Sequence, residues 1–68
     1  MNAKTTFIAD SIRKNSKRMA KLQTLHTAYE RRKQARAFIV AECAVKKIKL
    51  SGEEIGSATA MTLAGLCG

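Results

Sequence analysis

Hydrophobic residues in the first half of the chain recur every three or four positions, a spacing typical of an amphipathic helix. The stripe that they form consists of Ile8, Ile12, Met19, Leu22, Leu25 and Tyr29. No glycine or proline occurs between Thr6 and Leu50, and this stretch is rich in alanine, lysine, arginine, leucine and glutamine, which favour helices. We therefore predict a helix that begins near Thr5, Thr6 or Asp10 and extends almost to Leu50.

In the second half of this stretch the hydrophobic stripe moves to a different side of the predicted helix. Its members are Phe38, Ala41, Val45 and Ile48. The run Ala37–Ala41 is apolar on every side, which usually indicates burial. Residues 30–34, between the two stripes, are entirely polar. Either the chain turns at residues 30–34, giving two consecutive helices, or one helix continues through them, and the lack of a turn residue favours the continuous helix.

A continuous helix from Thr6 to Leu50 would be about 65 Å long and could not bury its apolar stripe against itself. It must fold back or pair with another chain, and we expect a homodimer or a higher homo-oligomer. The residues predicted to form that oligomer interface are Leu22, Leu25, Tyr29, Phe38, Val45 and Ile48. Asn15 falls within the seam, where it either fixes register and oligomeric state or lies at a solvated edge.

The composition changes sharply near Ser51. Residues 1–50 contain all 13 Lys and Arg and three acids, a net charge of +10, whereas residues 51–68 carry only Glu53 and Glu54, a charge of −2. Ser51 followed three residues later by Glu54 matches a capping box, so we predict that a further helix starts at Ser51 and runs toward Leu66. The expected fold is all-α and a single domain, with a basic helical region at 1–50 and a short C-terminal helix within 51–68 that packs on it.

The segment from Ile48 to Gly68 partly resembles the helix-turn-helix family of DNA-binding motifs. The positions that carry the resemblance are Ile55, Gly56, Ala60, Met61, Thr62 and Leu66. It implies a turn near Ala60 and then a recognition helix, although no Arg, Lys, Asn or Gln follows Glu54 to read a base edge. The favoured alternative is one plain helix whose small residues, Gly56, Ala60 and Ala64, let a neighbouring helix approach closely.

The charge distribution carries the functional prediction. Between Arg13 and Arg36 lie nine Lys or Arg and a single acid, and a face of one sign attracts the phosphates of nucleic acid. The predicted nucleic-acid-binding residues are Arg13, Lys14, Lys17, Arg18, Lys21, Arg31, Arg32, Lys33 and Arg36. We predict a small non-enzymatic protein that binds nucleic acid, DNA rather than RNA, as a regulatory or accessory factor. The alternative is an interaction module or inhibitor that docks its basic helix on an acidic protein surface.

Length and chemistry argue against other classes of function. A 68-residue chain has little room for a cofactor pocket, and three aromatic residues are too few for a surface on which several bases stack. His26, Cys43 and Cys67 cannot complete a zinc site, and no catalytic pair can be assembled, so we predict no metal, cofactor or catalytic residue. Cys43 is interpreted as a small buried hydrophobe. No apolar run is long enough to span a bilayer, and we expect a cytoplasmic protein without a membrane partner.

Overall fold

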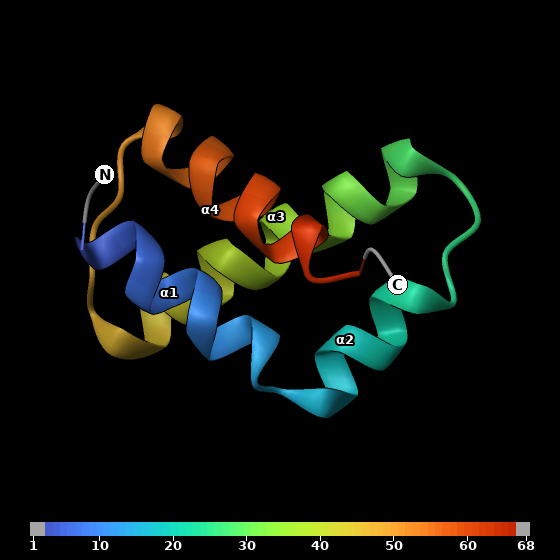
Figure 1. The fold of residues 1–68 in the computed structure, drawn as a ribbon. Coiled ribbons are helices and arrows are strands. Elements are labelled where there is room, and N and C mark those ends of the chain that lie inside the picture. Colours follow the sequence, from blue (N-terminus) through green and yellow to red (C-terminus); the bar gives the residue numbers. More distant parts are fainter. Residues whose placement is uncertain (1–2, 67–68) are drawn as a thin grey trace.

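The computed structural model describes residues 3–66, which form four α-helices joined by short connections (Figure 1). Helix α1 spans Ala3–Arg13, α2 spans Ser16–Gln23, α3 spans Ala28–Lys46 and α4 spans Gly52–Ala64. The predicted all-α fold is confirmed. The prediction of one long helix, or of two, before residue 50 is wrong, because three helices occupy this region. Residues 30–34 lie inside α3 and form no turn.

The chain breaks before α2 and before α3 because a short polar side chain caps each helix. Asn15 Oδ1 accepts the backbone N–H of Arg18 over 3.1 Å, and Thr27 Oγ1 accepts that of Glu30 over 3.1 Å. Such side chains compete with helical hydrogen bonds, so they can end one helix and start the next without glycine or proline. Asn15 is exposed at the start of α2, and the expectation that it lies in a continuous helical seam is wrong.

The connection between α3 and α4 has a distinct cap at each end. Lys47 ends α3 in the left-handed conformation, with φ of 55°, a region that glycine occupies more readily than lysine. Ser51 and Glu54 form the predicted capping box. The Ser51 N–H donates to Glu54 Oε1 over 2.8 Å, and the Glu54 N–H donates to Ser51 Oγ over 3.2 Å. The predicted start of the last helix is thereby confirmed.

The helices fold back on one another, so much of the apolar surface is covered within one chain. Helices α1 and α4 pack against α3 and against each other, and α2 packs against α1 and α3 (Figure 1). The buried hydrophobic residues are Ile8, Ala9, Ile12, Leu22, Ala35, Ile39, Cys43 and Ala58. The first predicted stripe therefore supplies Ile8, Ile12 and Leu22 to the interior, and the prediction that Cys43 is buried is confirmed.

The second predicted stripe is wrong in its position on α3. The side of α3 that is buried carries Ala35, Ile39, Glu42 and Cys43. Within the run 37–41, Ile39 is buried and Phe38 half-buried, and the other three residues are exposed. Because α1 and α4 pack against the Ile39 side, the opposite side of α3 stays open in its second half. We call this surface the outer apolar face, and it consists of Ala37, Val40, Ala41, Ala44 and Val45.

Helix α4 is uninterrupted at the positions where the helix-turn-helix resemblance required a turn. Ala60, Met61 and Thr62 are all helical, so the plain helix is confirmed and the helix-turn-helix is wrong. The end of that segment, residues 67–68 with Cys67, lies outside the described residues. The expectation that Gly56 and Ala60 mediate close helix contact is also wrong, because both residues are exposed.

Candidate nucleic-acid interface

A groove of about 490 Å³ lies between the first half of α3 and the side of α4 that faces it. Its α3 wall consists of Tyr29, Arg32, Lys33 and Arg36, and its α4 wall consists of Gly56, Thr59, Ala60 and Leu63. The α3 wall is therefore cationic and carries an aromatic ring, whereas the α4 wall consists of uncharged and mostly small side chains. We call this feature the α3–α4 groove.

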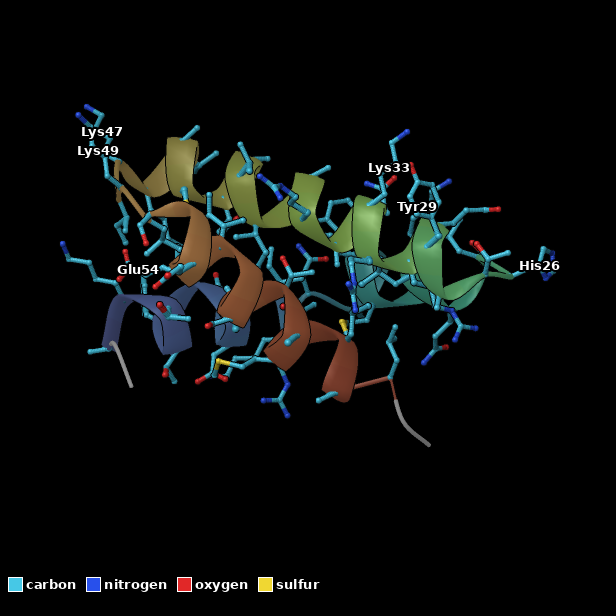
Figure 2. All side chains as sticks on the ribbon, turned by 90° about the horizontal axis from the view of Figure 1, so that it is seen from above. His26, Tyr29, Lys33, Lys47, Lys49 and Glu54 are labelled. Carbon is cyan, nitrogen blue, oxygen red and sulfur yellow. The ribbon has the colours of Figure 1, made fainter. Side chains whose placement is uncertain are left out.

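The α3 wall of the groove follows from helical spacing. Tyr29, Lys33 and Arg36 recur at intervals of four and three residues, which places them on one side of the helix. Figure 2 shows Tyr29 and Lys33 on the same side of α3, and Tyr29 is 73% exposed. The first turns of α3 are held in place by Arg31, whose Nε donates to the Leu25 carbonyl over 2.9 Å and so ties the preceding loop to the helix.

The α4 wall of the groove offers space and no charge. A Cβ added at Gly56 would meet no atom within 4 Å, so the helix surface is open there. The Thr59 hydroxyl donates to the Ile55 carbonyl over 2.7 Å and is already satisfied. Glu54 lies at the end of the molecule opposite Tyr29 (Figure 2). The α4 wall therefore adds no negative charge to the lining of the groove.

The three cations of the groove pair with no carboxylate within residues 3–66, in contrast to Arg13, Arg18 and Lys46. Within residues 3–66, the salt bridges join Asp10 to Arg13, and Glu42 to Arg18 and Lys46. None of these bridges involves a residue of the α3–α4 groove. Exposed charges without a partner raise the local concentration of anions, so this wall is suited to an anionic ligand.

The nine predicted nucleic-acid-binding residues fall into three groups. Arg32, Lys33 and Arg36 line the α3–α4 groove. Lys14, between α1 and α2, and Lys17 and Lys21, in α2, are exposed and lie outside the α3–α4 groove. Arg13, Arg18 and Arg31 bond to groups within the protein. The breaks before α2 and α3 separate the six cations that a single continuous helix would have clustered on one side, which are Arg13, Lys14, Lys17, Lys21, Arg31 and Arg32.

Glu42 forms salt bridges with two cations, Arg18 and Lys46, inside the fold. Its carboxylate accepts the Ser11 hydroxyl over 2.7 Å and Arg18 Nη1 over 2.8 Å, and it lies 3.3 Å from Lys46 Nζ. We call Ser11, Arg18, Glu42 and Lys46 the Glu42 cluster. The Ser11 hydrogen bond, helped by Arg18 and Lys46 and opposed by burial, lowers the pKa of Glu42 from its ordinary value of 4.5. Arg18 also lies over the Phe38 ring, 5.4 Å from its centroid.

Reasoning from the sequence missed the Glu42 cluster, because it joins three helices that the sequence did not separate. The available signal was an acid, Glu42, inside an apolar stretch and four residues before Lys46. A charge in such a stretch needs a partner when it is buried. Sequence reasoning also assigned Tyr29 to an oligomer seam, whereas the structure places it in the α3–α4 groove.

The six residues predicted to form an oligomer interface lie in different environments. Leu22 is fully buried within the chain, Phe38 and Ile48 pack partly buried against the core, and Leu25 is half-buried. Tyr29 and Val45 are each 73% exposed. Only two of the six therefore present most of their surface to a second chain, and the oligomer interface stays a prediction.

Potential metal ligands and the thiol of Cys43 can be placed in the part of the chain that the structure describes. No three His, Cys, Asp or Glu side chains within residues 3–66 gather where they could hold a metal ion. Burial raises the pKa of the Cys43 thiol, which disfavours the reactive thiolate. Each helix in this range is too short or too polar to cross a membrane.

Comparison with protein families, curated proteins and solved structures finds no match to this chain. The α3–α4 groove is therefore interpreted from its own geometry. Its cations can bind anionic groups without forming a covalent bond, its ring can stack on a flat group, and its uncharged wall can cover apolar surface. These are properties of a binding site.

Proposed function

We propose that this protein binds nucleic acid, DNA in preference to RNA, as a small non-enzymatic regulatory or accessory protein. The observation that carries the proposal is the α3–α4 groove, in which Arg32, Lys33 and Arg36 have no carboxylate partner within residues 3–66. Cations that neutralise phosphates release the counterions condensed on the polymer, and this release drives binding. Arginine adds paired hydrogen bonds to phosphate oxygens.

The remaining positive charge supports the same proposal at longer range. The chain carries a net charge of +8, and Lys14, Lys17 and Lys21 are exposed outside the α3–α4 groove. Charges at a distance from a binding site attract a polyanion and raise its association rate, without setting the geometry of the contact. The two groups of lysines and arginines can therefore be tested separately.

Fluorescence anisotropy with labelled duplex DNA, single-stranded DNA and RNA at about 50 and 200 mM salt tests the proposal. Replacing Arg32, Lys33 and Arg36 together by Gln removes up to three phosphate contacts. The slope of log affinity against log salt should then decrease by about 2 to 3. Arg31 is left in place because it bonds to the Leu25 carbonyl.

The matched control replaces Lys14, Lys17 and Lys21 by Gln, which removes the same charge from a different surface. We expect this variant to keep most of the salt slope. Equal losses in both triple variants would mean that overall charge, and not the groove, attracts the polymer. No binding of any of the three nucleic acids at about 50 mM salt would reject the proposed function.

A second candidate function, docking on an acidic protein, is favoured by the outer apolar face. Val40 is 48% exposed and Val45 is 73% exposed, and this face lies on the same helix as the cations of the groove. A partner helix with apolar residues and acidic flanks could use both features. A labelled acidic amphipathic peptide tests this: Val40→Asp should abolish its binding if this candidate is right, and absence of binding to the unchanged protein would reject it.

A further inference from the structure

We propose further that the α3–α4 groove takes a single strand of nucleic acid, with phosphates along its α3 wall and one base stacked on Tyr29. This inference rests on the proposed function and specifies its substrate class. The two walls of the groove differ in chemistry. The α3 wall is cationic, and the α4 wall consists of uncharged and mostly small residues.

The two walls match the two sides of a single strand. A single strand presents phosphates along one side and unpaired bases along the other, and proteins that hold such strands combine a positive groove with aromatic side chains. A duplex keeps its bases stacked inside and presents phosphates on its outside. In a duplex complex, the cations of α3 would still find phosphates, but the uncharged α4 wall and the ring of Tyr29 would find no base.

Tyr29 is the aromatic residue that the fold leaves unengaged. The ring of Phe38 lies under Arg18 at 5.4 Å, and the ring of Phe7 lies under Lys46 at 5.2 Å. No such contact covers Tyr29 within residues 3–66, and its side chain stands beside Lys33 on the open side of α3 (Figure 2). An exposed ring next to unpaired cations can stack on a base while its neighbours hold the flanking phosphates.

The dimensions of the groove suit one or two nucleotides. Its volume of about 490 Å³ lies in the range of small-molecule sites. Gly56 leaves one end of the α4 wall open, and Ala60 and Leu63 continue the wall as an apolar surface. A base that stacks on Tyr29 can lie against this surface. One ring cannot provide the row of stacking positions that several bases need, but it is sufficient for one base.

The first experiment uses the fluorescence of Tyr29 itself, because the chain has one tyrosine and no tryptophan. The unchanged protein is titrated with an oligothymidine of about 12 nucleotides, and with an abasic strand of the same length. Both strands carry the same phosphates. We expect the oligothymidine to quench the tyrosine emission and to bind about ten-fold or more tightly than the abasic strand, which should leave the emission unchanged. Oligodeoxyuridine and oligouridine, which differ only in the 2′-hydroxyl, test the sugar preference in parallel, and we expect the deoxyribose strand to bind more tightly.

Two pairs of variants test the two walls. Tyr29→Leu should lower the affinity for oligothymidine to that for the abasic strand, and Tyr29→Phe should retain it. Gly56→Glu places an acid in the groove and should weaken binding of both strands. Its matched control is Gly52→Glu, the same change on the same helix at a position that does not line the groove. An added Cβ meets no atom within 4 Å at either glycine, so both variants should fold.

The outcomes separate this inference from the proposed function. Equal affinity for normal and abasic strands, or tighter binding of duplex DNA, together with no effect of Tyr29→Leu, would overturn the single-strand site. The loss caused by the Arg32, Lys33 and Arg36 replacements would then still support the proposed function. Failure of every nucleic acid to bind at about 50 mM salt would reject both.

Discussion

The Glu42 cluster and the α3–α4 groove use the same residue types for different purposes. In the cluster, Arg18 and Lys46 lie within 3.3 Å of one carboxylate, and both side chains are at most about a third exposed. In the groove, no carboxylate within residues 3–66 pairs with a cation. A paired charge holds helices together, whereas an unpaired one is available to a ligand. Positive charge in this chain therefore occurs in two settings, paired and unpaired, which the contacts distinguish and the composition does not.

The largest effect on stability is expected from Glu42→Gln. The amide keeps the shape of the side chain but removes the charge that Arg18 and Lys46 share, and it can accept fewer hydrogen bonds. We expect a loss of about 2 kcal/mol in the free energy of unfolding, as for hydrogen bonds to a charged group, measured by urea denaturation. The control is Glu30→Gln on the same helix, where Glu30 is exposed. Nucleic-acid affinity of the folded Glu42→Gln variant should stay within about two-fold of the original, since phosphate contacts dominate that affinity.

A direct comparison of Arg18→Gln with Arg36→Gln makes the same chemical change in the two regions. Arg18→Gln removes a partly buried ion pair and the contact with Phe38, and it should cost about 1 to 2 kcal/mol of stability. Arg36→Gln should change stability by less than about 0.5 kcal/mol, as surface substitutions usually do, but it should weaken nucleic-acid binding. Denaturation and anisotropy on both variants test this. The opposite assignment of the two losses would contradict the division of roles.

The all-α fold, the start of α4 and the first apolar stripe could be predicted from the sequence because each has a local cause. The Ser51–Glu54 capping box needs only four residues, and Ile8 and Ile12 are one turn apart. The helix breaks were missed because Asn15 and Thr27 are weaker signals than glycine or proline. Asparagine and threonine can both occur inside a helix. Their side chains act as caps only where their own backbone is outside the helical conformation.

The division of the cations could not be predicted, since it depends on how the helices fold back. Arg18 and Glu42 are 24 positions apart, and Ser11 and Glu42 are 31 apart. The hydrophobic periodicity within one helix does not show which residues of other helices it contacts. The buried side of α3 was misjudged for the same reason: alanine and valine occur all around its second half, so hydropathy alone does not show which side α1 and α4 cover. Tyr29 was recognised as important, but its surroundings come from α4.

Acid should weaken the Glu42 cluster. The pKa of Glu42 is lowered below 4.5 by the Ser11 hydrogen bond and the neighbouring cations, so the folded state holds its proton less tightly than the unfolded state. This contribution to stability is complete above the ordinary pKa of 4.5 and is lost as the pH falls through the lower, folded-state pKa. Thermal melts from about pH 6 to pH 2 should show a steeper fall in Tm for the original chain than for Glu42→Gln. Parallel curves would contradict this assignment.

One substitution on the groove side of the comparison, Gly56→Ala, is expected to give a small gain in stability. Gly56 lies inside α4, is exposed and has open space around an added Cβ. Alanine should therefore stabilise the protein by about 0.5 to 1 kcal/mol, because it loses less backbone freedom on folding than glycine does. Gly65→Ala is the contrasting variant: its Cβ would lie 3.1 Å from Arg13 Nε and 3.3 Å from the Thr62 carbonyl oxygen, so the same gain is not expected. A higher Tm for Gly56→Ala would show that the fold does not need glycine at this position. Unchanged single-strand affinity in Gly56→Ala, together with lower affinity in Gly56→Glu, would show that the open space on the α4 wall is used by the ligand.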